Sequence, residues 1–333
     1  MHVVVIGASA GGVAALKALA SELPADFDAA ILLVLHVAPS GPGLLPQILS
    51  RAGPLPCVHP DTGQPLQPGH IYAAPPDFHM LIDGQRRIRL SHGPKENRTR
   101  PAVDPLFRSA ALAFGSEVIG VVLTGHLDDG MAGLFTIKEC GGVVIIQDPA
   151  DAEVPSMPTN AAQHVAVDYR VPLSALAPLL VRLTMEPRKR EQRVMSDQLK
   201  IEAMIMENPE DFSRGVTQIG DPSLLTCPEC HGTLMKLRDQ HLVRFRCHTG
   251  HGFSAQNLLE GLDEEAEEAI WNAVRVLQES AMLREHLARH ARAAGRDDQA
   301  RALLGAAQEK LRRAKRLRSV VATPQQHDDG VTT

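Results

Sequence analysis

The sequence predicts an α/β fold with a doubly wound, mostly parallel sheet, followed by a small cysteine-containing module and an α-helical hairpin. Three observations predict this arrangement. Short β-branched runs alternate with Ala/Leu-rich stretches through about residue 185, which is typical of βαβ units. Three of the five cysteines lie together after residue 226. Beyond residue 260, apolar residues recur at helical spacing on both sides of a glycine-containing break.

Six strands are expected in the first 185 residues. Between about Pro54 and Leu90 the strands are closely spaced and separated by Pro/Gly turns, so this segment is expected to form an antiparallel hairpin at the sheet edge. The six predicted strands are Val3–Ile6, Ala30–Leu35, His70–Ala73, His79–Ile82, Val118–Leu123 and Gly142–Gln147.

Four further segments are expected after the sheet domain of residues 1–185. They are a charged linker at 186–222, the cysteine module at 223–260, the helical hairpin at 261–320 and a disordered tail at 321–333. The hairpin is predicted from heptad-like spacing on both sides of a break at residues 293–297. Its apolar positions are Ile270, Val274, Leu277, Ala281, Ala300, Leu304, Ala307, Leu311 and Ala314.

Composition excludes several classes of protein. The 333 residues include 44% hydrophobic residues and carry a net charge of −5, which suits a globular protein and argues against nucleic-acid binding. No apolar run reaches the roughly 20 residues of a membrane span, and Met1 leads into a strand without the basic start of a signal peptide. Five cysteines do not suit a disulfide framework. We therefore expect a cytoplasmic protein with reduced thiols, in which Cys57 and Cys140 are small buried residues.

The first predicted strand ends in a turn suited to a nucleophile. Residues 7–11 (Gly-Ala-Ser-Ala-Gly) fit the G-x-S-x-G elbow, in which small residues let a strand-to-helix turn expose a serine hydroxyl. A helix that begins near Gly11 would direct free N–H groups at Ser9, as an oxyanion requires. A dinucleotide site is the alternative, but its Gly-x-Gly-x-x-Gly pattern fails because Ser9 stands where the second glycine belongs.

A histidine and two aspartates follow other predicted strands. His36 comes directly after one strand, and Asp128 and Asp129 lie in the loop after another. The carboxyl ends of parallel strands meet at one edge of an open sheet, where catalytic groups gather. We expect Nε2 of His36 to accept the proton of Ser9, while Asp129 orients the imidazole. Asp128 remains an alternative on this reasoning, and a structural histidine and a simple Asp-Gly turn are the non-catalytic ones.

The late cysteines form two ligand pairs with the spacing of a zinc site. Cys227 and Cys230 form a C-x-x-C pair, and His251 follows Cys247 by four residues. Two such pairs can surround Zn²⁺ tetrahedrally, so we assign these four residues as ligands of a structural zinc ribbon. His248 is the alternative fourth ligand. Four protein ligands leave no open position for catalysis, but the metal would supply folding energy to a short segment.

Together these segments resemble the catalytic domain of the chemotaxis protein-glutamate methylesterase family (CheB). The resemblance covers about residues 1–185, and its motifs occur in the same order. The matching motifs are residues 6–12 (IGASAGG), 35–38 (LHVA), 71–75 (IYAAP), 79–80 (HM), 97–107 (NRTRPAVDPLF), 123–130 (LTGHLDDG) and 156–158 (SMP).

The resemblance implies the roles of three residues. Ser9 becomes the nucleophile, His36 the general base and Asp129, rather than Asp128, the orienting acid. The implied reaction is hydrolysis of γ-glutamyl methyl esters on chemoreceptor-like proteins with release of methanol, and glutamine deamidation is a related activity. No catalytic metal or organic cofactor is implied.

The resemblance also implies substrate and oxyanion contacts. Ala10, His126 and Met157 are expected beside the oxyanion or the substrate. Arg98 and Arg100 are candidates for contacting an acidic methylation region, and a structural salt bridge is the alternative for each.

Three features depart from the family pattern. The family commonly has threonine at the position of Ala10 and methionine at that of His126, where an imidazole would alter substrate choice or the pH profile. A contribution through the backbone N–H would tolerate the change. The family usually carries a receiver domain, whereas here Met1 starts at the first strand, so we expect no control by phosphorylation in cis.

The leading hypothesis is therefore a serine hydrolase that acts on a methylated chemoreceptor-like signalling protein, with a regulatory partner at the C-terminal region. The alternative is a catalytically weak or inactive signalling scaffold that acts through its zinc ribbon and helical hairpin. A ribbon that binds nucleic acid is a third hypothesis, against which the negative net charge counts.

Overall fold

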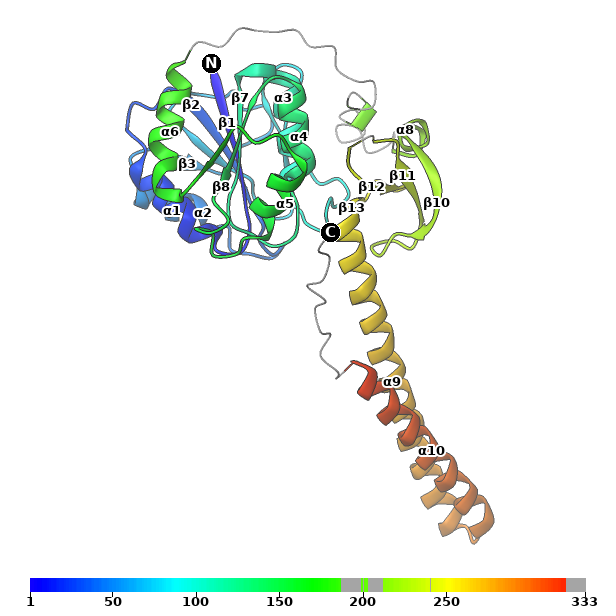
Figure 1. The fold of residues 1–333 in the computed structure, drawn as a ribbon. Coiled ribbons are helices and arrows are strands. Elements are labelled where there is room, and N and C mark those ends of the chain that lie inside the picture. Colours follow the sequence, from blue (N-terminus) through cyan, green and yellow to red (C-terminus); the bar gives the residue numbers. More distant parts are fainter. Residues whose placement is uncertain (187–198, 200, 203–211, 240, 322–333) are drawn as a thin grey trace. The chain divides into compact units, whose positions relative to one another are not determined.

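The computed structural model describes residues 1–186, 199, 201–202, 212–239 and 241–321 (Figure 1). The chain divides into two compact units, Met1–Leu258 and Leu259–Thr333. The first unit contains the predicted sheet domain together with the cysteine module, and the second is helical. The predicted tail lies outside the described residues except for residue 321. Among the described helices, none combines the length and the apolar character needed to cross a bilayer.

The core of the first unit is a seven-stranded sheet in the order β3-β4-β2-β1-β7-β8-β9. All neighbouring strands are parallel, which confirms the doubly wound prediction. Two of its strands, β3 and β9, are too short to show a sequence period and were not predicted. The strands of this sheet are β1 His2–Ala8, β2 Ala29–Leu35, β3 Cys57–Val58, β4 Ile71–Ala73, β7 Val118–Val122, β8 Val143–Gln147 and β9 Tyr169–Val171.

Helices cover both faces of this sheet (Figure 1). Successive side chains of β1 alternate between two apolar clusters, as the pleat of a strand requires. Val3 and Val5 pack with α3, α4 and α5, whereas Val4 and Ile6 pack with α1, α2 and α6. The covering elements are α1 Gly12–Glu22, α2 Leu45–Ala52, α3 Val103–Phe114, the 3₁₀ turn Gly115–Glu117, α4 Met131–Glu139, α5 Ser156–His164 and α6 Leu173–Met185.

The segment predicted to form a hairpin contains one. Strands β5 His79–Ile82 and β6 Ile88–Ser91 pair antiparallel as a separate two-stranded sheet. In the same segment, β3 and β4 join the main sheet in parallel. The two cysteines of this domain, Cys57 and Cys140, are both buried, as predicted, and burial raises the pKa of Cys57 to about 12.

The cysteine module is a four-stranded antiparallel sheet, β10-β11-β12-β13. Helix α8 and the start of β10 lie within the segment expected to be a linker, and α9 begins at Ala255, inside the range predicted for the module. Glu202, also in the expected linker, is fully buried, and its ion pair with Arg244 at 2.8 Å compensates its charge there. The elements are α8 Phe212–Ile219, β10 Gly220–Thr226, β11 Thr233–Leu237, β12 Arg244–Cys247 and β13 Gly252–Ser254.

The two long C-terminal helices are α9 Ala255–Ala293 and α10 Asp297–Val321, and they confirm the predicted hairpin and its break. Several buried side chains recur at intervals of seven residues. They are Val274, Ala281 and Ala288 in α9, and Ala300, Ala307 and Ala314 in α10. Small residues at these positions let two helices approach closely, and a strict seven-residue repeat keeps the same face of each helix inward.

Burial in the main sheet generates a stability prediction. Leu32 of β2 is 0% exposed, so its replacement by alanine is expected to lower the free energy of unfolding by about 2–5 kcal/mol. The matched control is Leu44→Ala, because Leu44 is 52% exposed and its loss should change the free energy by at most about 0.5 kcal/mol. Urea unfolding followed by circular dichroism measures both. Equal midpoints for the two variants would contradict the assignment of Leu32 to the core.

Candidate active site and metal centre

Ser9 lies in the turn between β1 and α1, directly after the last residue of the strand. Gly11 has φ 76°, a left-handed conformation that suits glycine, and α1 begins at Gly12, as predicted. The turn is held by Thr124, whose backbone oxygen accepts from the N–H of Ser9 at 3.0 Å. Thr124 Oγ1 also donates to the carbonyl oxygen of Ala10 at 2.9 Å. The half-buried Ser9 is therefore fixed at the C-terminal edge of the sheet.

His36 follows β2, which neighbours β1, and its N–H donates to Ala8 O at 3.1 Å. Its Nε2 atom lies 2.7 Å from Asp129 Oδ2, so the structure brings this predicted pair together. The expectation that Nε2 faces Ser9 was wrong, because Asp129 occupies that nitrogen. Nδ1 is the ring nitrogen that remains for the serine. In the described part of the chain, no hydrogen bond joins His36 to Ser9 Oγ, and such contacts are often long without substrate.

Asp129 is the most heavily hydrogen-bonded carboxylate of the site and is 3% exposed. Helix α3 begins after Ala102 without a side-chain cap of its own. Its first two N–H groups, those of Val103 and Asp104, instead donate to Asp129 at 2.6 and 3.2 Å. The N–H of Gly130 donates to Oδ1 at 3.0 Å. A carboxylate suits this position because the N-terminal end of a helix carries unpaired donors and a partial positive charge.

Asn97 and Asp104 are site residues that the sequence analysis missed. Asn97 Nδ2 donates to Asp129 Oδ1 at 2.8 Å and to Asp104 Oδ2 at 2.9 Å, and all three side chains are buried. Both missed residues belong to the motif of residues 97–107, which was matched to the family without a role for either. A buried asparagine between two carboxylates leaves no pattern of spacing by which it could be recognised.

The two buried carboxylates favour opposite protonation states. Burial opposes ionisation of Asp129, but the hydrogen bonds and the charge of His36, with the donors described above, outweigh it and lower the pKa. Burial, and then the adjacent charge of Asp129, raise the pKa of Asp104. Asp129 is thus held as the anion that can orient an imidazole and stabilise its protonated form.

The remaining predicted residues fall in different surroundings. A Cβ atom at Gly125 would lie 2.7 Å from the Cβ of Ser9 and 2.1 Å from Sδ of Met157, so the buried Met157 and Ser9 flank this glycine. Ala10 is half-buried and His126 is exposed.

The predicted arginines lie in the loop before α3. Arg100 forms an ion pair with Asp77 at 2.7 Å and donates to Gly93 O. This ion pair is the structural salt bridge that was the alternative role for Arg100. Arg98 has φ 66° in the same loop. Asp128, the alternative to Asp129, is buried and bonds to Ser254 and Asn257.

The four predicted metal ligands converge in the cysteine module. One donor atom from each of Cys227, Cys230, Cys247 and His251 lies within 4.8 Å of the others. The Sγ atoms of Cys230 and Cys247 are 3.7 Å apart, and His251 Nδ1 lies 3.7 and 3.6 Å from Sγ of Cys227 and Cys247. Zn–S bonds of about 2.3 Å place the sulfurs of a tetrahedral site roughly 3.8 Å apart, so this donor set fits zinc. The exposed alternative, His248, lies outside the group.

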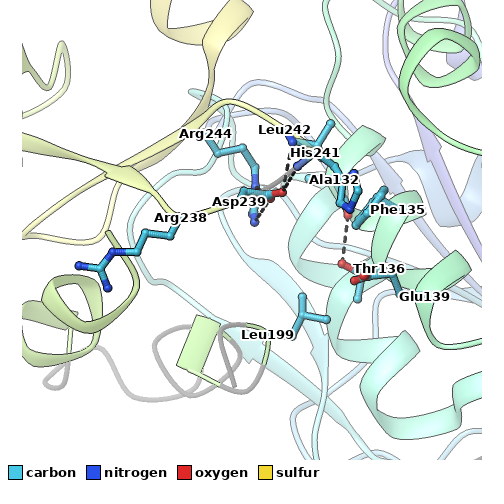
Figure 2. A pocket seen from close by; sticks show the side chains of 10 residues that line it. All are labelled: Ala132, Phe135, Thr136, Glu139, Leu199, Arg238, Asp239, His241, Leu242 and Arg244. Carbon is cyan, nitrogen blue, oxygen red and sulfur yellow. Dashed lines mark hydrogen bonds and ion pairs between the residues drawn. The ribbon is translucent and has the colours of Figure 1, made fainter. Parts of the chain in front are cut away.

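A pocket of about 280 Å³ lies where the module meets α4 (Figure 2). The ring centroids of Phe135 and His241 lie 5.0 Å apart in this pocket, and Asp239 forms an ion pair with Arg244 at 2.8 Å. Its lining residues are Ala132, Phe135, Thr136, Glu139, Leu199, Arg238, Asp239, His241, Leu242 and Arg244. This pocket contains none of Ser9, His36 and Asp129, so it is separate from the candidate active site.

Comparison with known proteins shows the family of the chain. The CheB methylesterase family model matches residues 4–180. The chain belongs to the CheB methylesterase family. The family and fold predictions are thereby confirmed, and the chain is a carboxylic ester hydrolase. The match ends before the group formed by Cys227, Cys230, Cys247 and His251.

Relatives and a solved structure give the extent of the similarity. A putative protein-glutamate methylesterase/protein-glutamine glutaminase of Leptospira interrogans is 37% identical over 180 residues, which cover 54% of this chain and 93% of that protein. Protein-glutamate methylesterase/protein-glutamine glutaminase 4 of Myxococcus xanthus is 42% identical over 156 residues, which cover 47% of this chain and only 44% of that protein. The crystal structure of the Thermotoga maritima CheB methylesterase catalytic domain has a TM-score of 0.53 and 34% identity, covering 55% of this chain and 98% of that one.

The donor geometry generates a prediction about metal content. The purified chain is expected to hold about one tightly bound zinc ion, because three thiolates and an imidazole satisfy tetrahedral coordination. Cys227→Ser should abolish tight binding, whereas the matched control Cys57→Ser, a buried cysteine of the main sheet, should retain it. Elemental analysis after dialysis measures the content. Retention of zinc by Cys227→Ser would remove that residue from the ligand set.

Proposed function

We propose that this chain hydrolyses γ-glutamyl methyl esters on chemoreceptor-like proteins through Ser9, His36 and Asp129. The observation that carries the proposal is the contact of His36 with a buried Asp129, at the same sheet edge as the serine turn. A serine needs a general base to become nucleophilic at neutral pH, and the base needs an anion to orient it.

The proposed reaction has two steps. Nδ1 of His36 accepts the proton of Ser9 as Oγ attacks the ester carbonyl, and the protonated imidazole then passes that proton to the departing methoxide. Methanol leaves, and Ser9 carries a γ-glutamyl ester. His36 next deprotonates a water molecule, which attacks this ester, and the proton returns to Ser9 as the free glutamate is released. Asp129 stays ionised throughout and stabilises the imidazolium. No metal or organic cofactor takes part.

Two backbone groups suit the oxyanion of the tetrahedral intermediate. Within the described residues, the N–H groups of Ala10 and His126 donate no hydrogen bond to a backbone oxygen. Both groups lie beside Ser9: one follows it in the turn, and the other follows Gly125. Because backbone donors would stabilise the oxyanion, the alanine and the histidine at these positions are compatible with the chemistry.

The names of the relatives support a methylated glutamate of a protein as the substrate and a glutamine side chain as a second one. Deamidation would follow the same steps with ammonia in place of methanol. A methylated signalling protein in the cytoplasm is therefore the proposed partner. The proposed metal has no role in these steps; Cys227, Cys230, Cys247 and His251 would hold a zinc ion that stabilises the ribbon.

Methanol release from a methylated chemoreceptor cytoplasmic fragment tests the proposed function. Ser9→Ala is expected to lower the rate by at least about 10³-fold, because the nucleophile is lost. The matched control is Ser21→Ala, which removes an exposed serine hydroxyl from α1 and should leave the rate unchanged.

A serine-directed fluorophosphonate gives a second readout that does not depend on the receptor chosen. Labelling of the wild type, but not of Ser9→Ala, would support an activated serine. A folded, zinc-loaded chain that neither releases methanol nor reacts at Ser9 would contradict the proposal and favour the scaffold hypothesis.

A further inference from the structure

The junction between the cysteine module and α9, where β13 ends at Ser254 and α9 begins at Ala255, lies against the loop that carries Asn97. Gly252 of β13 exchanges backbone hydrogen bonds with this loop: Asn97 N donates to Gly252 O at 2.8 Å, and Gly252 N donates to Lys95 O at 3.2 Å. Two residues further on, the N–H of Ser254 donates to Asn97 Oδ1 at 3.0 Å. Strand β13 of the cysteine module is thus hydrogen-bonded to the loop that carries Asn97, and Asn97 in turn donates to Asp129.

The N–H of Ser254 determines which end of the Asn97 amide faces the active site. Because it occupies Oδ1, the amide turns Nδ2 toward Asp129 and Asp104. The reverse orientation would place an oxygen against two carboxyl groups and leave the Ser254 N–H without its acceptor, and burial makes both outcomes costly. Ser254 therefore acts on Asp129 through a single intervening side chain.

The same junction holds the neighbouring aspartate. Ser254 Oγ donates to Asp128 Oδ1 at 2.7 Å, and Asn257 Nδ2 donates to the same oxygen. Asp128 is 5% exposed, so these donors replace the water that its carboxylate would otherwise bind. Since Asp128 precedes Asp129 directly, this anchor restrains the backbone that presents the catalytic carboxylate.

Two of the proposed metal ligands lie next to the junction. Cys247 and His251 bracket the turn between β12 and β13, and Cys247 N donates to His251 O at 3.0 Å. Arg246, which directly precedes Cys247, is 1% exposed and forms an ion pair with Glu96 at 3.1 Å. Glu96 also binds Arg108 of α3, at 2.5 Å. Loss of the metal would loosen a turn that is tied to both supports of Asp129, the Asn97 loop and α3.

We propose that Ser254 and Asn257 are positioning residues for Asp129, and that the metal-bound module holds them in place. The proposal rests on the proposed function, in which Asp129 orients His36. Neither residue contacts His36 or Ser9 in the structure; they act through Asn97 and Asp128. The zinc ribbon then contributes to the esterase activity, because the bound metal determines how firmly Asp129 is held.

The double variant Ser254→Ala/Asn257→Ala tests the proposal in the full-length, zinc-loaded chain. It removes both side-chain donors to Asp128, so kcat for methanol release is expected to fall about 10- to 100-fold with KM unchanged. The matched control is Asn272→Ala, an exposed asparagine further along α9, which should leave kcat as in the wild type. Ser254→Thr with Asn257 intact keeps the hydroxyl and should retain most of the activity.

A spectroscopic readout separates positioning from general damage and needs no substrate. The proton shared by His36 Nε2 and Asp129 should give a low-field proton resonance that is absent in Asp129→Asn. Exchange broadening of this signal in the double variant, with zinc content and circular dichroism unchanged, is the expected result. Removal of zinc by a chelator should broaden it in the wild type as well.

The outcomes distinguish the two proposals. A wild type that neither releases methanol in a Ser9-dependent way nor reacts with the fluorophosphonate at Ser9 contradicts the proposed function, while the resonance still reports on positioning. If the wild type is active and the zinc-loaded double variant has the same kcat and the same resonance, the positioning role of the Ser254 and Asn257 side chains is overturned.

Discussion

Five hydrogen-bond donors converge on the carboxylate of Asp129, and the organisation of the first unit depends on this convergence. They are His36 Nε2, Asn97 Nδ2 and the N–H groups of Val103, Asp104 and Gly130. One side chain thus caps the N-terminus of helix α3, holds the Asn97 loop and contacts the imidazole of His36. Because the group is buried, an aspartate without these donors would be protonated instead of charged. The same contacts that complete the fold therefore maintain the anion that the chemistry requires.

The two neighbouring buried carboxyl groups show how local surroundings divide their roles. Asp129 accepts from a helix N-terminus and an imidazole, which outweigh its burial and lower its pKa. Burial, and then the negative charge of Asp129, raise the pKa of Asp104. Asn97 donates to both through one amide nitrogen, which spaces them and links their positions. A pair of this kind keeps one anion in a small buried volume without the repulsion of two.

The cysteine module packs against the sheet domain through apolar contacts and buried ion pairs. Leu242 packs into the apolar cluster that also contains Leu134 of α4. Arg244 and Arg108 both lie near the buried carboxylate of Glu202, which in turn belongs to a segment expected to be a linker. Buried ion pairs of this kind contribute little net stability, but removal of one partner costs about 3–5 kcal/mol. These ion pairs restrict how the cysteine module can pack on the sheet domain, since few other placements would satisfy all of these charges.

Much of this molecule follows from the sequence alone. Short β-branched apolar runs predicted the main strands of the sheet, the Gly-Ala-Ser-Ala-Gly turn singled out Ser9, and cysteine spacing predicted the four residues that converge, because each of these signals is local or repeats at a fixed interval. The tertiary structure alone decided which nitrogen of His36 meets Asp129, that Asn97 and Asp104 belong to the site, and that Ser254 reaches it from 157 residues away. Those contacts join segments whose separation along the chain carries no pattern, so they arise only when burial and hydrogen bonding are satisfied together in three dimensions.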